Sequence, residues 1–134
     1  MRVYCPGCWD LIHVGHLNIL EKAKSVGDYL IVAVSNSQLM IKKKKIEIVP
    51  FKDRIRMIAS LKCVDQAVEE RKIFDVDQFK KLRCDLFVIG SDWKERNDIP
   101  RLNWLRDNNK ILFLPYTSGI STSFIKKSIV EKCR

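Results

Sequence analysis

The sequence predicts an α/β fold, a doubly wound parallel sheet with helices on both faces. Continuous apolar runs rich in branched residues, typical of strands buried on both sides, alternate with segments whose apolar residues recur at helical spacing. The length of 134 residues suits one hydrophobic core, so we expect a single domain over residues 1–134. The sequence shows no internal repeat and no linker.

The first three elements form a β-α-β unit. Arg2–Cys5 predicts a short strand, and Tyr29–Ser35 predicts a strand covered on both faces. Between them, apolar residues recur at three-residue steps from His16 to Val26, and Gly27 stands where helices often end. The crossover between parallel strands is almost always right-handed, which fixes the topology of this half.

The second half continues the alternation. A polar segment that contains Lys42–Lys45 follows, and Pro50 then precedes a helix with Ile55, Ile58 and Leu61 on one face. Later segments predict strands at Val64–Val68, Asp85–Ile89 and Ile111–Leu114, helices at Asp75–Leu82 and Pro100–Asn108, a turn at Pro115–Gly119 and a final helix from about Ser121.

Composition narrows the function classes. The net charge of +9 attracts anions, which include nucleotides, phosphorylated metabolites, nucleic acid and acidic membrane surfaces. Five cysteines, an odd number, favour reduced thiols over a disulfide scaffold. The longest apolar stretch is far shorter than the roughly 20 residues that cross a bilayer, and the N-terminus lacks a signal-peptide pattern. We therefore expect a cytoplasmic protein without a membrane partner.

Three loops carry the residues that suggest chemistry. In an open parallel sheet, ligands bind beyond the carboxyl ends of the strands. The loops after the first strand, after the Asp85–Ile89 strand and after the last strand should therefore meet at one site. These loops are Cys5–His16, Gly90–Trp93 and Tyr116–Ser123.

The histidines lie at the start of the first predicted helix. His13 and His16 flank Gly15, so both imidazoles can face one point while the glycine lets an anion approach the backbone. A helix N-terminus adds unpaired N–H groups and a partial positive charge. The pattern predicts a phosphate-binding site, and the hydroxyls of Ser121–Ser123 repeat it at the last helix.

The same segment has an alternative interpretation as a zinc site. Cys5 and Cys8 precede His13 and His16, and all four are residue types that bind zinc. The gap between the two pairs is much shorter than in a zinc finger. We therefore expect no metal held by protein side chains.

His13-Val-Gly-His16 resembles the HxGH motif of the nucleotidyltransferase family, and Gly119-Ile-Ser-Thr-Ser123 is similar to the ending of its cytidylyltransferase branch. The similarity covers nearly the whole chain, and the length, the Gly90–Trp93 segment and Asp53-Arg54 are most similar to the small glycerol-3-phosphate cytidylyltransferases. The resemblance implies a Rossmann-like nucleotidyltransferase fold that moves CMP from CTP to a small alcohol phosphate, with glycerol 3-phosphate favoured. It also implies Mg²⁺ as the cofactor and a homodimer.

The motifs and this resemblance together assign roles to individual residues. The catalytic candidates are His13 and His16, which would stabilise the transition state, and Lys43, which would contact substrate phosphates. The nucleotide-binding candidates are Gly7, Cys8, Trp9, Gly15, Lys45, Asp92, Thr117, Gly119, Ile120, Ser121 and Thr122. The acceptor-binding candidates are Asp10, Arg54, Lys62 and Trp93.

Several departures from the family pattern concern the acceptor. Gly7-Cys-Trp-Asp10 stands where the glycerol-3-phosphate enzymes usually have GTFD, and Cys5-Pro-Gly-Cys8 is more similar to the ethanolamine-phosphate enzymes. Lys62 and Tyr116 replace two usual arginines, so two bidentate phosphate contacts are lost. Phosphoethanolamine or phosphocholine as the acceptor, and a loss of activity, are therefore alternatives.

An alternative from another class is a non-catalytic basic module that binds nucleotides or nucleic acid. Such a module would lose affinity steeply as salt rises. Apart from Lys42–Lys45 the basic residues are scattered, and they form no patch interleaved with aromatic residues. A nucleic-acid partner is therefore not expected.

Overall fold

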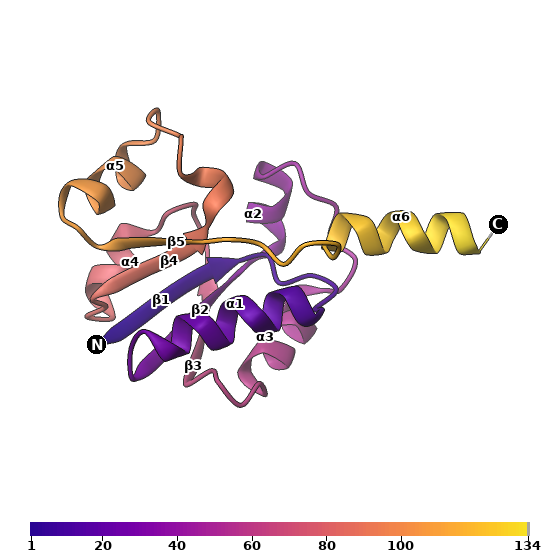
Figure 1. Cartoon of the computed structure of the whole chain (residues 1–134), viewed down its shortest axis with the longest axis horizontal. Coiled ribbons are helices and arrows are strands. Elements are labelled where there is room, and N and C mark those ends of the chain that lie inside the picture. Colours follow the sequence, from indigo (N-terminus) through magenta and orange to yellow (C-terminus); the bar gives the residue numbers. More distant parts are fainter. Residues whose placement is uncertain (134) are drawn as a thin grey trace.

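The computed structural model describes residues 1–133 (Figure 1). The strands are β1 (Arg2–Gly7), β2 (Tyr29–Ser35), β3 (Gln66–Glu70), β4 (Leu86–Gly90) and β5 (Ile111–Leu114). The helices are α1 (Val14–Ser25), α2 (Ser37–Lys42), α3 (Phe51–Ala59), α4 (Val76–Lys81), α5 (Pro100–Asp107) and α6 (Thr122–Lys132), with a 3-10 turn η1 (Ser91–Trp93) after β4. The five strands are parallel, in the order β3-β2-β1-β4-β5, so the predicted doubly wound α/β class is confirmed.

The sheet separates two hydrophobic cores. On one face, α1 and α3 pack on the strands through Leu20, Ala23 and Ile58. On the other face, α4 and α5 pack through Phe79 and Leu102. Helices on both faces explain why the β2 sequence is apolar without alternation.

The segment after β2, which the sequence predicts as polar and irregular, contains the short helix α2. Asn36 caps this helix, since its Oδ1 accepts the Leu39 N–H at 2.8 Å. Leu39 and Met40 are buried. Two adjacent apolar residues show no helical period, so the sequence pattern does not reveal a helix of this length.

Two further details differ from the prediction. β3 begins and ends two residues later than Val64–Val68, which places Glu70 at its carboxyl end. Val26, not Gly27, caps α1, and Gly27 does not have the left-handed backbone of a C-cap glycine. A Cβ at Gly27 would lie 2.6 Å from the Met1 carbonyl oxygen, so close packing requires glycine there.

Helix α6 stands apart from both cores. It extends away from the sheet (Figure 1), and none of its residues in the described part of the chain is buried. Phe124, Ile129 and Val130 are each more than half exposed. No helix within residues 1–133 has both the length and the apolar character needed to span a bilayer.

Candidate active site

A pocket opens where the ladder between β1 and β4 ends. β1 pairs with β4 only at Val3 and Tyr4, although both strands continue beyond these residues. Pro6 follows in β1, and its missing N–H favours an end to pairing there. The strands part at the point where the strand order reverses, which is where open α/β sheets bind ligands. The pocket has a volume of about 320 Å³, enough for a small ligand.

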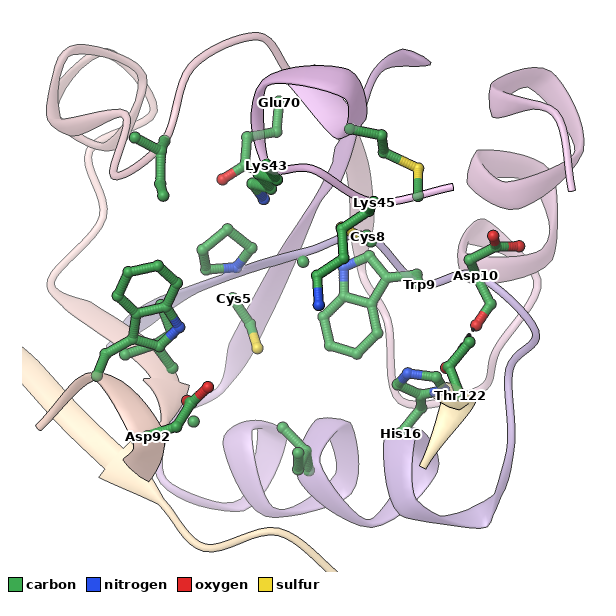
Figure 2. A pocket seen from close by; sticks show the side chains of 18 of the residues that line it. Cys5, Cys8, Trp9, Asp10, His16, Lys43, Lys45, Glu70, Asp92 and Thr122 are labelled. Carbon is green, nitrogen blue, oxygen red and sulfur yellow. Dashed lines mark hydrogen bonds and ion pairs between the residues drawn. The ribbon is translucent and has the colours of Figure 1, made fainter. Parts of the chain in front are cut away.

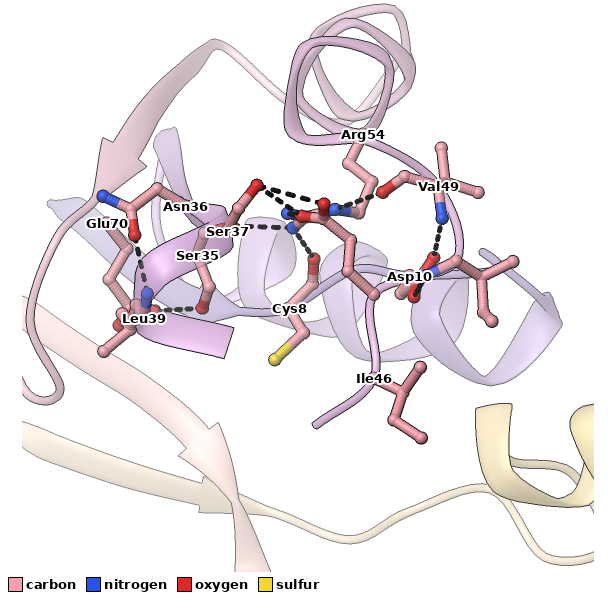
Figure 3. Close-up of polar contacts among 12 residues, drawn as sticks. Cys8, Asp10, Ser35, Asn36, Ser37, Leu39, Ile46, Val49, Arg54 and Glu70 are labelled. Atoms are coloured by element: carbon pink, nitrogen blue, oxygen red, sulfur yellow. Dashed lines mark hydrogen bonds and ion pairs between the residues drawn. The ribbon is translucent and has the colours of Figure 1, made fainter. Parts of the chain in front are cut away.

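The loop between β1 and α1 is held in an uncommon conformation. Trp9 and Leu11 have φ angles of 54° and 49°, a region that costs a non-glycine residue on the order of 1–3 kcal/mol. Trp9 Nε1 donates to the Ala33 carbonyl at 3.1 Å. The Asp10 carboxylate accepts the backbone amides of residues 48–49 at 2.7 and 3.0 Å (Figure 3). Asp10, predicted to bind the acceptor, thus fastens two loops together.

His13 and His16 form a capping box at the start of α1. His13 Nδ1 accepts the Gly15 N–H at 3.0 Å, and His16 Nδ1 accepts the His13 N–H at 3.2 Å. The two rings stack with their centroids 3.9 Å apart. Because Nδ1 accepts a hydrogen bond in each ring, the proton of each neutral imidazole lies on Nε2. The backbone therefore fixes both rings as Nε2–H donors.

Both imidazoles are neutral near pH 7. Burial, followed by the proximity of His13, lowers the pKa of His16 to about 4, while Asp10 acts in the opposite direction. Burial also lowers the pKa of His13. The pair can therefore act through hydrogen-bond donation rather than through positive charge.

The start of α6 lies beside His16 in the same part of the pocket (Figure 2). Ser121 caps the helix, since its Oγ accepts a backbone N–H of the first turn at 3.0 Å. Thr122 Oγ1 donates to the Asp10 carbonyl at 2.9 Å across 112 residues of sequence. The Ile120 side chain packs beside Gly15. Two helix N-termini from opposite ends of the chain thus face one pocket.

Three lysines line the pocket in different electrostatic states. Lys43 Nζ pairs with Glu70 Oε1 at 3.0 Å and donates to Ser35 Oγ at 2.8 Å. Lys126 Nζ donates to a backbone carbonyl at 2.9 Å. The Lys45 ammonium has no hydrogen-bond or ion-pair partner among the described residues, and Figure 2 shows its side chain in the centre of the pocket. Lys45 is therefore the cation most available to a phosphate.

Tyr116 and Asp92 form the side of the pocket that follows β4 and β5. Tyr116 Oη donates to Asp92 Oδ1 at 2.8 Å and lies over Gly90, where a Cβ would be 2.1 Å from Oη. Burial, then the hydrogen bond to Asp92, raises the pKa of the Tyr116 phenol. Trp93 packs edge-on against Phe74 with ring centroids 5.1 Å apart. A neutral donor thus stands where the resemblance described above implies a guanidinium.

Two predicted acceptor-binding residues do not reach the pocket. Arg54 is 1% exposed, donates to three backbone carbonyls that include those of Cys8 and Ser35, and pairs with Glu47 (Figure 3). It thereby supports the loops behind the site. Lys62 is exposed in the connection from α3 to β3. This connection enters β3 at its amino end, whereas the pocket lies at the carboxyl ends of the strands, so Lys62 is far from the pocket.

The other predicted residues gather at the pocket or directly behind it. The pocket is lined by Gly7, Cys8, Trp9, Asp10, His16, Lys43, Lys45, Asp92, Trp93 and Thr122. His13 stacks behind His16, and Thr117 Oγ1 accepts from Asn18 at 3.0 Å, outside the lining. Gly119 has a φ of 80° in the turn before α6, a conformation that favours glycine.

Sequence reasoning missed part of the lining. Glu70, Lys126 and the apolar side chains of Met40, Ile73 and Phe74 also line the pocket. The rule that residues at the carboxyl ends of strands line the site applies to Glu70 as well. The prediction misses Glu70 because it ends this strand two residues too early, at Val68.

The four residues of the alternative zinc site do not assemble around a metal. Both histidine Nδ1 atoms accept backbone hydrogen bonds. Burial raises the pKa of the Cys5 thiol to about 12, which disfavours the thiolate that zinc requires. In residues 1–133, no group of three or more His, Cys, Asp or Glu side chains is placed to hold a metal ion.

Known proteins are similar to this chain in sequence. The sequence model of the cytidylyltransferase-like family matches residues 4–128. The chain belongs to this family. It is 34% identical over 133 residues to the glycerol-3-phosphate cytidylyltransferase of Bacillus subtilis, with 96% of each chain covered.

Two further comparisons concern a second relative in sequence and a protein of similar fold. The chain is 36% identical over 93 residues to the ethanolamine-phosphate cytidylyltransferase of Mus musculus, which covers 69% of this chain and 23% of that one. A lipopolysaccharide core biosynthesis protein from Thermoplasma volcanium has the same fold, with a TM-score of 0.71 at 24% identity over 87% of this chain and 96% of that chain. The predicted family and its nucleotidyltransferase fold are confirmed.

Proposed function

We propose that the protein transfers CMP from CTP to glycerol 3-phosphate and releases pyrophosphate. The observation that carries this proposal is the meeting of the fixed Nε2–H donor of His16, with His13 stacked behind it, and the N-terminus of α6 at one pocket. Similarity over nearly the full length to a glycerol-3-phosphate cytidylyltransferase supports this acceptor. The comparisons do not favour the alternative of a non-catalytic binding module.

The proposed reaction needs no general base. The acceptor phosphate is already ionised near pH 7, so one of its oxygens can attack the α-phosphorus of CTP directly. The bond from the α-phosphorus to the bridging oxygen breaks, and pyrophosphate leaves with the electron pair. Negative charge then develops on the oxygens around the α-phosphorus.

The chain's own donors suit that charge. The Nε2–H groups of His13 and His16 are oriented before the reaction begins, so they stabilise the charge without reorganising. The ammonium of Lys45, unpaired among the described residues, lines the pocket and adds a positive charge. The N-terminus of α6 would bind the departing phosphates. Asp92, on the β4–β5 side, would accept hydrogen bonds from the ribose hydroxyls once the Tyr116 phenol is displaced.

Magnesium enters this proposal as a companion of the nucleotide. The Asp10 carboxylate accepts two backbone amides, and one oxygen of the Glu70 carboxylate binds Lys43, so these two carboxylates do not form a metal-binding set among the described residues. These residues fit a Mg²⁺ ion carried by triphosphate oxygens and water, which is its usual coordination. When bound, the ion would neutralise charge on the phosphates.

Pyrophosphate release tests the proposed function. We expect the purified protein to release pyrophosphate with CTP, Mg²⁺ and glycerol 3-phosphate, and more slowly with ATP in place of CTP. Phosphoethanolamine and phosphocholine are the competing acceptors. No release with any acceptor and either nucleotide would refute the proposal.

We also propose that the protein is a homodimer in the cytoplasm. Exposed apolar side chains on α6, among them Ile129 and Val130, support a partner surface. All five cysteines are free thiols, which supports a reducing compartment. Light scattering on the purified chain should give twice the chain mass of 15.7 kDa.

A further inference from the structure

The side of the pocket that follows β2 and β3 holds a carboxylate to which the proposed chemistry assigns no role. Glu70 ends β3, and its side chain is 1% exposed. Its Oε1 accepts two hydrogen bonds, from Ser35 Oγ at 2.6 Å and from Lys43 Nζ at 3.0 Å. Burying an ionised pair is costly, so a buried carboxylate in a ligand pocket calls for a role.

The second oxygen of this carboxylate has no hydrogen-bond partner in the described part of the protein. Oε2 accepts no hydrogen bond from any described residue, whereas every fully buried side-chain nitrogen or oxygen in residues 1–133 has a partner. Oε2 is therefore not fully buried, although the Glu70 side chain is only 1% exposed, and the pocket is the surface that Glu70 lines. Lys43 also lines the pocket, and two of its three ammonium protons are used. The pair thus offers one free acceptor and one free donor side by side.

The sheet order assigns this pair to the acceptor rather than to the nucleoside. Asp92 and Tyr116 follow β4 and β5, while Glu70 and Lys43 follow β3 and β2, with the β1 loop between them. Figure 2 shows Glu70 and Lys43 on the opposite side of the pocket from Asp92. Since the phosphates lie at the central loop in the proposed reaction, a nucleoside on the Asp92 side leaves the Glu70 side for the body of the acceptor.

The neighbouring donor and acceptor fit a hydroxyl-bearing acceptor. A vicinal diol can donate to Glu70 Oε2 and accept from Lys43 Nζ at the same time. An ammonium head would gain the carboxylate but be repelled by Lys43, and a trimethylammonium head has no N–H to donate. Met40, Ile73 and Phe74 line the same pocket and shield such hydrogen bonds from water.

We propose that Glu70, together with Lys43, binds the hydroxyl groups of the acceptor and thereby selects a polyol phosphate over an amino-alcohol phosphate. This inference rests on the proposed cytidylyl transfer and names the feature of the acceptor that the site reads. Loss of a hydroxyl leaves Oε2 of Glu70, or the third ammonium proton of Lys43, without a partner in the pocket. Sites of this kind discriminate strongly against the truncated substrate.

The test combines a truncated acceptor with a variant of nearly the same shape. n-Propyl phosphate has the same nucleophile and chain length as glycerol 3-phosphate but lacks both hydroxyls. For the wild-type protein we expect kcat/KM with glycerol 3-phosphate to exceed that with n-propyl phosphate, and that with phosphoethanolamine, by about 100-fold. Glu70→Gln should lower kcat/KM for glycerol 3-phosphate by at least about 10-fold, and leave n-propyl phosphate and the KM for CTP within about 3-fold.

Matched measurements separate the outcomes. Glu69→Gln changes the neighbouring residue of β3, which bonds Asn36 outside the pocket, and should leave both acceptors unaffected. Equal losses with both acceptors in Glu70→Gln would overturn the inference, because they would show a role through Lys43 or the fold alone. The inference would also be overturned if the wild-type kcat/KM for glycerol 3-phosphate exceeded that for n-propyl phosphate by less than about 10-fold, or if phosphoethanolamine were the better acceptor. These measurements need no variant. No pyrophosphate with any acceptor would instead refute the proposed function, and the inference with it.

Discussion

The N-termini of α1 and α6 face the same pocket, yet they are built in different ways. α1 is anchored in the core through buried Leu20 and Ala23, and its own capping box orients both imidazoles. α6 has no buried residue among those described, and its first turn is held through Thr122 and the Asp10 carbonyl. One half of the phosphate site is therefore fixed locally, whereas the other depends on long-range hydrogen bonds from Thr122 and Lys126. Changes at α1 should affect the chemical step, and changes at α6 should affect nucleotide affinity.

Replacing the imidazole of His16 should produce the largest effect. His16→Gln keeps an acceptor that can complete the capping box at that position, but its flexible amide does not hold an N–H at the position of the ring Nε2–H. We expect kcat for pyrophosphate release to fall at least about 100-fold, because one donor to developing charge is typically worth that much. The unfolding free energy should stay within about 1 kcal/mol of wild type.

A companion variant on the same helix start checks this division of roles. His13→Asn retains a side-chain cap and removes the other imidazole. A comparable loss of kcat is expected with little change in the KM for CTP. Activity within 10-fold of wild type in both variants would contradict the assignment of the imidazoles as transition-state donors.

Gly15 joins the two helix starts, so an added methyl group there tests whether they act together. A Cβ at this position would lie 2.7 Å from His13 Cε1 and 3.3 Å from Ile120 Cγ2. Gly15→Ala gains about 1 kcal/mol of helix propensity, and displacing the His13 cap costs a similar amount. We expect nearly unchanged thermal stability but about a 10-fold loss of kcat/KM. Val14→Ala, at the exposed neighbouring position, is the control and should retain activity.

The sequence allowed accurate prediction where the determining contacts are local. The His13–His16 spacing and the apolar β2 run follow from neighbours along the chain, and both predictions agree with the structure. The role of Asp10 depends on the amides of residues 48–49, and that of Arg54 on carbonyls as many as 46 residues away. No local pattern encodes such contacts. Glu70 was missed for a smaller reason, a two-residue error at the end of a strand.

The pH dependence of the unfolding free energy provides a smaller test of His16, at the start of α1. An unfolded histidine has a pKa of about 6.5, whereas that of His16 in the folded protein is lowered to about 4. Between these pH values the unfolded chain binds a proton that the native protein does not, so the unfolding free energy falls as pH drops from 6.5 toward 4. Above pH 6.5 the contribution of neutral His16 to the unfolding free energy is fully present.

Comparing the wild type with His16→Gln isolates the contribution of His16 to the unfolding free energy. Because the ring is partly exposed, water screens the effect, and we expect on the order of 1–2 kcal/mol. Urea denaturation at pH 7 and pH 4.5 should show that the wild type loses more stability than His16→Gln by this amount. Equal losses in the two proteins would show that His16 is not held neutral by its surroundings.

The smallest effect should come from a change at the start of α6. Thr122→Val keeps the shape of the side chain but removes the hydroxyl that donates to the Asp10 carbonyl. A hydrogen bond of this kind contributes about 1 kcal/mol, so loosening the start of α6 should raise the KM for CTP about 5-fold and leave kcat nearly unchanged. Ser128→Ala, farther along α6 and outside the pocket, should change neither constant. A fall in kcat as large as that of His16→Gln would instead mean that the α6 contact orients the reacting groups, and that the two helix starts are a single cooperative unit.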